Sequence, residues 1–104
     1  MFNLTSDICI NLAQVSSFST STNNSKVSKD TWRLIPQLFV SMNNGKEYKV
    51  ETLADIYNFC SESFDRTVTK LLWVALIAKL NKEMSEDNTY FLSAEDSDYL
   101  TKEV

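Results

Sequence analysis

The sequence predicts a single α+β domain over 1–104, in which a three-stranded antiparallel sheet (β-β-β) precedes two helices and a short C-terminal helix, all packed on one face of the sheet. Three observations predict this class. Strand-like alternation fills the first half of the chain, an Asn-Asn-Gly hairpin signal follows, and the second half has helical apolar spacing behind capping residues. With 43% apolar and 23% charged residues, a chain of 104 residues can build one core.

The first two strands are predicted on either side of a polar stretch. Apolar and polar residues alternate over 7–15, which predicts the first strand. From 16 to 31, eleven of sixteen residues are Ser, Thr or Asn, so we expect a mobile loop or a frayed strand extension there. The second strand is predicted over 31–42. Because proline lacks the N–H that a strand ladder uses, Pro36 indicates that this strand is at a sheet edge or is bent.

The turn after the second strand is predicted at Asn43-Asn44-Gly45. A three-residue loop sets Val40 opposite Tyr48. It also sets Leu38 opposite Val50, so the apolar side chains share one face, whereas a two-residue loop opposes apolar and charged side chains. We therefore predict the three-residue loop with its glycine at positive φ.

Two helices are predicted after the hairpin, because Thr52 and Asp55 form a capping pair and Asp65 can cap a second helix over about 66–84. The second helix is apolar on two sides. One side carries Val68, Leu71, Leu72, Ala75 and Leu76, and the other carries Trp73, Ile77, Leu80 and Met84. A helix that is apolar all round must be covered on both sides, so we expect the C-terminal segment or a partner chain to cover the side opposite the sheet.

The C-terminal segment, about 83–104, is predicted to carry a short strand or turn and then a helix from 94 to about 102, capped by Ser93 and Asp96. Its charge is the clearest functional signal in the sequence. The segment carries seven acidic residues and one basic residue, for a net charge of −6, whereas residues 1–82 have a net charge of +2. The alternative to a binding surface is a merely solvated acidic surface.

Several kinds of chemistry are not indicated by the composition. The chain has no histidine, and its two cysteines lack metal-site spacing, so we expect neither an enzyme nor a metal or cofactor site. Cys9 and Cys60 are predicted to be buried free thiols. The longest apolar run has eight residues and no secretory leader is visible, so we expect a cytoplasmic protein without membrane contact.

These observations favour a small acidic protein-interaction module. We expect an inhibitor of the immunity-protein, antitoxin or phage anti-defence type that blocks a basic, nucleic-acid-handling protein, because an acidic surface can occupy a groove built for phosphates. Direct binding of nucleic acid is not expected. The candidate partner-binding residues are the acids and aromatic residues of the C-terminal segment: Glu86, Asp87, Tyr90, Phe91, Glu95, Asp96, Asp98 and Tyr99.

Two alternatives remain open. Thr52-Leu53-Ala54-Asp55-Ile56 followed by Arg66-Thr67-Val68-Thr69-Lys70 resembles a bacterial helix-turn-helix, and the resemblance spans 52–72. It implies a DNA-binding regulator whose DNA-facing residues are Arg66, Thr67, Thr69 and Lys70. Residues 46–83 carry six acidic and six basic side chains, which is no electrostatic footprint for phosphates. The second alternative is a homo-oligomeric structural or accessory subunit that dimerises through Trp73, Ile77, Leu80 and Met84.

Overall fold

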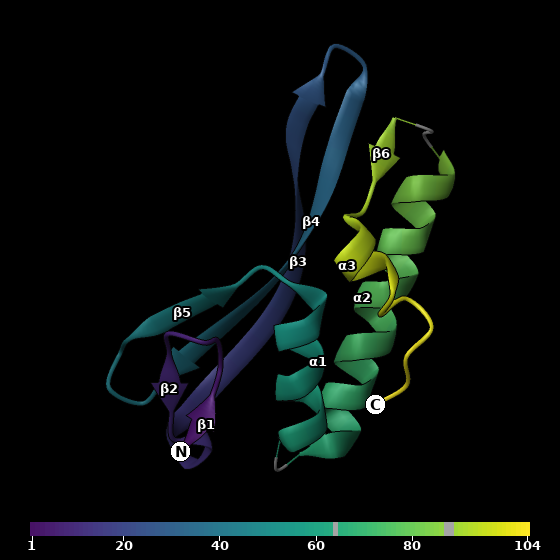
Figure 1. The fold of residues 1–104 in the computed structure, drawn as a ribbon. Helices are drawn as coiled ribbons and strands as arrows, with labels where there is room; N and C mark the ends of the chain where they lie inside the picture. The colour runs from purple at the N-terminus through teal and green to yellow at the C-terminus, as the bar shows by residue number, and fades with distance from the viewer. Residues whose placement is uncertain (64, 87–88) are drawn as a thin grey trace.

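The computed structural model describes residues 1–63, 65–86 and 89–104 and confirms an α+β fold in which a sheet precedes two long helices and a short C-terminal helix (Figure 1). The elements are β1 (Phe2–Asn3), β2 (Cys9–Ile10), the 3₁₀ turn η1 (Leu12–Gln14), β3 (Val15–Ser28), β4 (Thr31–Met42), β5 (Glu47–Val50), α1 (Leu53–Glu62), α2 (Arg66–Glu86), β6 (Tyr90–Phe91) and α3 (Ala94–Ser97). Strands pair in the order β3-β4-β5, and β6 pairs with β4 in parallel, so the sheet is mixed rather than purely antiparallel.

Strand β3 occupies most of the polar stretch at about 16–31, for which the sequence predicts a mobile loop or a frayed strand extension, and of these two the structure has a strand. The strand pairs with β4 from the Val15–Met42 pair to the Ser28–Thr31 pair. Backbone hydrogen bonds to β4 do not depend on apolar side chains, and β4 itself supplies the apolar residues. Figure 1 shows the two strands as a long arm whose tip extends beyond the helices.

The strand predicted over 7–15 is mostly wrong. Within it, Cys9–Ile10 forms a short strand that pairs with β1, the chain then turns into η1, and Val15 is already the first residue of β3. The Asn11 side chain accepts a hydrogen bond from the Ala13 N–H at 3.0 Å. Such a local side-chain bond offers the backbone an alternative to a strand ladder.

The strand predicted over 31–42 is confirmed as β4, and Pro36 has a definite place in it. β4 is the central strand, but on the side away from β3 it pairs with β6 only at 32–33 and with β5 only at 38–41. Among the described residues, no strand pairs with the section around Pro36 on that side. The proline therefore occupies a local edge within a central strand.

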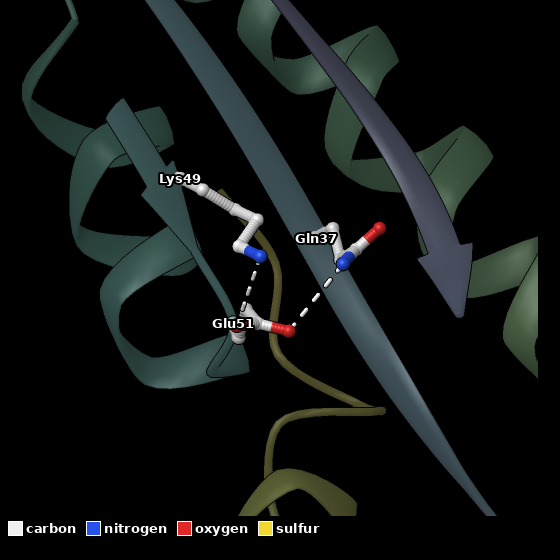
Figure 2. Close-up of polar contacts among 3 residues, drawn as sticks. All are labelled: Gln37, Lys49 and Glu51. Carbon is white, nitrogen blue, oxygen red and sulfur yellow. Dashed lines mark hydrogen bonds and ion pairs between the residues drawn. The ribbon is translucent and has the colours of Figure 1, made fainter. Parts of the chain in front are cut away.

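A polar cluster links β4 to the segment that leads from β5 into α1 (Figure 2). Gln37 is 8% exposed, and its Nε2 donates to Glu51 Oε2 at 3.3 Å. Lys49 Nζ lies 3.6 Å from the other carboxylate oxygen of Glu51. Because Lys49 and Glu51 are about half exposed, their ion pair contributes little stability, and the partly buried hydrogen bond from the Gln37 side chain is the more important contact.

The β4–β5 hairpin has the predicted register, with Val40 opposite Tyr48 and Leu38 opposite Val50. Gly45 has a φ of 86°, as the three-residue loop requires, and its N–H donates to the Met42 carbonyl at 3.0 Å. The register places these apolar side chains on the helix-covered face of the sheet.

The two helices begin at the predicted caps. The Thr52 hydroxyl accepts from the Asp55 N–H, and Asp65 Oδ1 accepts from the Val68 N–H at 3.3 Å. Figure 1 shows α1 and α2 side by side and running in opposite directions. The main buried side chains contributed by β4, β5, α1 and α2 are Leu34, Leu38, Val40, Val50, Leu53, Ile56, Phe59, Cys60, Trp73, Leu76 and Leu80.

Helix α2, for which the sequence predicts cover on both sides, is covered on one side only within this chain. Trp73 and Leu80, from the stripe proposed for a homodimer, are buried in the core of the chain itself, and Ile77 and Met84 pack against that core. The stripe therefore packs within the chain itself and is not a free surface for a second copy. On the other predicted side, Leu76 is buried and Leu72 packs against the core, so residues of both predicted sides share one buried face of the helix. The side opposite that buried face is exposed. The exposed residues on that opposite side include Val68, Leu71, Val74 and Ala75.

Candidate functional site

The predicted partner-binding residues do not form one surface. Glu86, Phe91, Glu95 and Asp98 are exposed, whereas Tyr90 and Tyr99 are half-buried, Asp96 is buried, and Asp87 lies outside the described residues. Helix α3 ends at Ser97 instead of continuing to about 102, and a turn follows it in which the Tyr99 N–H donates to the Asp96 carbonyl. The segment therefore combines structural and solvent-facing positions.

Asp96 has a structural position that excludes it from a surface. Its side chain is 3% exposed, and its Oδ1 accepts a hydrogen bond from the backbone N–H of Leu53, the first residue of α1, at 2.9 Å. The first N–H groups of a helix have no partner within that helix, and a carboxylate is a favourable one. The assignment of Asp96 to a partner-binding surface is therefore corrected.

Tyr99 anchors the end of the chain to the helices. Its ring lies 5.6 Å from that of Tyr57, and Lys102 Nζ lies 5.5 Å from the Tyr99 ring centroid. Backbone carbonyls complete the attachment, because Trp73 Nε1 donates to the Lys102 carbonyl at 2.9 Å and the Tyr57 hydroxyl donates to the Glu103 carbonyl at 3.1 Å. Contacts within the fold thus account for the position of Tyr99.

A polar groove, which we call the acidic groove, lies between the β3–β4 arm, the C-terminal end of α2 and β6. Its volume is about 520 Å³. Figure 1 shows β6 and the end of α2 beside the upper part of the arm. The lining residues are Thr22, Asn23, Asn24, Leu34, Glu83, Glu86 and Tyr90. Two carboxylates, two amides and a phenol therefore surround the groove, and none of these lining residues carries a positive charge.

The two carboxylates of the acidic groove are incompletely paired. Glu83 Oε1 accepts a hydrogen bond from Thr22 at 3.2 Å, but Glu83 Oε2 is buried and has no hydrogen-bond partner among the described residues. Glu86 lies 3.9 Å from Lys82 Nζ, and both side chains are more than 60% exposed, so that ion pair is weak. A buried carboxylate oxygen without a donor is costly, and a ligand that brings a positively charged donor would satisfy it.

Most of this groove is not predicted by the sequence. Glu86 and Tyr90 are among the predicted site residues. Glu83 is not among them, although it belongs to the acidic C-terminal segment. The polar stretch that supplies Thr22, Asn23 and Asn24 is predicted to be a mobile loop or a frayed strand extension. The groove exists because β3 extends past the core to the end of α2, and no local pattern in the sequence indicates that juxtaposition.

The residues proposed to face DNA are only partly available. Arg66, Thr67 and Lys70 are exposed, but Thr69 is 0% exposed. Its hydroxyl donates to the Cys60 carbonyl at 3.0 Å, where it joins α2 to α1. A side chain in that position cannot enter a DNA groove without unpacking the helices. The predicted DNA-facing set is therefore corrected for Thr69.

The side chains that most often bind metals do not cluster in the described residues. No group of three or more His, Cys, Asp or Glu side chains within them is placed to hold a metal ion. Cys60 is 0% exposed, and burial raises the pKa of its thiol to about 12, which disfavours the nucleophilic thiolate. Cys9 is exposed rather than buried as predicted, and its thiol donates to Asn3 Oδ1 at 2.7 Å. In the part of the chain that the structure describes, no helix has the length and apolar character needed to cross a membrane.

Comparison of the chain with protein-family models, with curated proteins and with solved structures finds no match in any of the three. A functional proposal for this protein therefore rests on its own residues and their geometry.

Proposed function

We propose that the protein binds a basic protein partner through the acidic groove and so blocks that partner. The observation that carries the proposal is the carboxylate of Glu83, which has a buried oxygen without a donor among the described residues, inside a groove that also contains Glu86. A lysine ammonium or an arginine guanidinium supplies both the charge and the N–H donors that this oxygen lacks. The ring of Tyr90 offers a face on which a guanidinium can stack.

The charge of the C-terminal segment supports the class of partner. The C-terminal segment has a net charge of −6, and Glu86, Glu95 and Asp98 are exposed. Proteins that handle nucleic acids present clusters of lysine and arginine for phosphates, and an acidic surface competes for those clusters. Complementary charge also accelerates encounter between partners. An inhibitor of a nucleic-acid-handling protein therefore remains the favoured proposal over a DNA-binding regulator, because Thr69 of the predicted recognition helix is buried against α1.

The proposal is tested by comparing three immobilised forms of the protein in nuclease-treated extract of its host. These are the parent, the double variant Glu83→Gln/Glu86→Gln and the control Glu47→Gln/Glu62→Gln, which removes two exposed charges elsewhere. We expect the parent and the control to capture the same basic protein and the groove variant to lose it. The purified pair should then show at least about tenfold weaker binding for the groove variant. Capture of only acidic or neutral proteins, or equal capture by all three forms, would contradict the proposal.

A further inference from the structure

The outer side of α2 carries an exposed apolar stripe that the fold does not use. Val68, Leu71 and Val74 are 47%, 66% and 54% exposed. Residues three positions apart lie on the same side of a helix, so the three side chains form one line along two turns. Single exposed apolar residues are ordinary, whereas an aligned set on one helix is typical of a docking surface.

The stripe is continuous with an apolar groove at its side. The groove has a volume of about 390 Å³ and lies between α2 and the C-terminal residues 102–104. Val74 belongs to both the stripe and the groove, and Trp73 and Ile77 also line the groove. The two features together form a ridge with a depression beside it, which we call the α2 outer surface.

Basic residues border the α2 outer surface. The charged side chains of residues 66–82 are all arginine or lysine, and none is acidic. At 100° per residue, Lys70 and Lys79 fall on opposite flanks of the stripe, and Lys82 follows it toward the C-terminal end. All three lysines are exposed. The described acidic residue that lines the adjoining groove is Glu103. The charge around the stripe is therefore complementary to an anionic ligand.

We propose that the α2 outer surface docks an acidic amphipathic helix of a partner protein. Such a helix would lay its apolar side along Val68, Leu71 and Val74, place one larger side chain in the adjoining groove, and direct its carboxylates toward the flanking lysines. The depression favours a protein side chain over a lipid surface, because a planar bilayer does not fill a groove. The surface is separate from the acidic groove and has the opposite charge, so the inference does not depend on the proposed function.

The test selects ligands without assuming a partner. A displayed library of helical peptides about four turns long, with apolar residues at helical spacing and randomised polar positions, is enriched on the full-length protein. We expect the enriched peptides to carry net negative charge. Leu71→Ser, and separately Lys70→Glu/Lys79→Glu, should each weaken their binding about tenfold or more by fluorescence anisotropy. Val27→Ser removes an apolar side chain of similar exposure at the tip of the arm and should leave the affinity unchanged.

Three results would overturn the inference. The first is an enriched set without net negative charge, and the second is equal binding by the parent and Leu71→Ser. The third is Leu71-dependent binding to vesicles of phosphatidylserine and phosphatidylcholine without any enriched peptide, which would assign the surface to anionic lipid. The Glu83→Gln/Glu86→Gln variant should keep full affinity for the enriched peptides. A matching loss in that variant would show that the peptides bind elsewhere and would also overturn the inference.

Discussion

The carboxylate of Asp96 accepts a hydrogen bond from the backbone N–H of Leu53 at 2.9 Å, although the two residues are 43 positions apart in the sequence. Both side chains are buried, and Leu53 is the first residue of α1. Thr52 already caps this helix locally through the Asp55 N–H. Asp96 therefore satisfies a second N–H group at the N-terminus of α1 and holds this helix against the C-terminal segment.

Replacing Asp96 should destabilise the fold. Asp96→Ala leaves the buried N–H of Leu53 without an acceptor, so we expect the free energy of unfolding to fall by about 2 kcal/mol. Asp96→Asn keeps an acceptor oxygen but loses the charge, and its effect should be smaller. Asp98→Ala is the matched control, since Asp98 is exposed on the same segment. Urea denaturation measures all three, and equal stability of Asp96→Ala and Asp98→Ala would contradict the structural role.

Gly45 should be required for its backbone conformation alone. A Cβ atom at this position would meet no atom within 4 Å, so a substitution there is penalised by the positive φ of 86° and not by a clash. We expect Gly45→Val to lower the free energy of unfolding by about 1 kcal/mol or more, because β-branched residues resist positive φ. Gly45→Asn should cost less, since asparagine enters this region more readily. Thermal unfolding that ranks the valine variant equal to the asparagine variant would refute the explanation.

The parts of the fold that the sequence predicts correctly are those decided by residues near one another. Thr52 and Asp55 are three positions apart, and the register of the β4–β5 hairpin follows from a three-residue loop and the alternation on either side of it. Gly45 indicates both the loop length and the conformation. In these elements, local propensity and tertiary packing favour the same structure.

The parts that the sequence does not predict depend on distant neighbours. The Ser, Thr and Asn side chains of β3 give no apolar signal, and the strand exists because β4 pairs with it along the whole arm. Asp96 resembles a surface residue in the sequence because it lies in an acid-rich segment. Its burial depends on Leu53, which a local pattern cannot show. The acidic groove escapes prediction for the same reason, since Thr22 meets Glu83 only in the folded chain.

The buried thiol of Cys60 predicts an alkaline loss of stability. A cysteine in the unfolded chain ionises near the ordinary thiol pKa of 9.0, whereas burial raises the pKa of Cys60 in the folded state to about 12. Between these values the unfolded state binds fewer protons than the folded state, so the free energy of unfolding decreases as pH rises. This loss of stability is absent below about pH 8. Between the two pKa values, the free energy of unfolding falls by up to about 1.4 kcal/mol for each pH unit.

This effect is measured as a difference between variants, because other groups also titrate in alkaline solution. The stability of the parent relative to Cys60→Ala should decrease by about 1 kcal/mol between about pH 8 and about pH 10. A thiol reagent provides an independent check. It should label the exposed Cys9 in the folded protein and label Cys60 only after denaturation. A constant difference across this pH range, or rapid labelling of both thiols, would show that Cys60 is accessible to water.

The last four residues should control the environment of Trp73. Its indole N–H donates to the Lys102 carbonyl, and its side chain is 2% exposed. Deleting 101–104 removes this acceptor and the Glu103 carbonyl that binds the Tyr57 hydroxyl. We therefore expect Trp73 fluorescence to shift to longer wavelength and become accessible to acrylamide, because water replaces the protein around the indole. The experiment is done in a Trp32→Phe background, so that all tryptophan fluorescence comes from Trp73.

The control separates backbone coverage from side-chain contacts. Lys102→Ala keeps the carbonyl that binds the Trp73 indole but removes the ammonium group that lies 6.0 Å from the Tyr57 ring centroid and 5.5 Å from that of Tyr99. We expect its fluorescence to match that of the full-length background, since an exposed cation–π contact is worth only about 0.5–1 kcal/mol. If the deletion leaves the Trp73 emission and its quenching unchanged, residues 101–104 do not cover the indole in solution. In that case the groove between them and α2, which is part of the proposed docking surface, is open on one side.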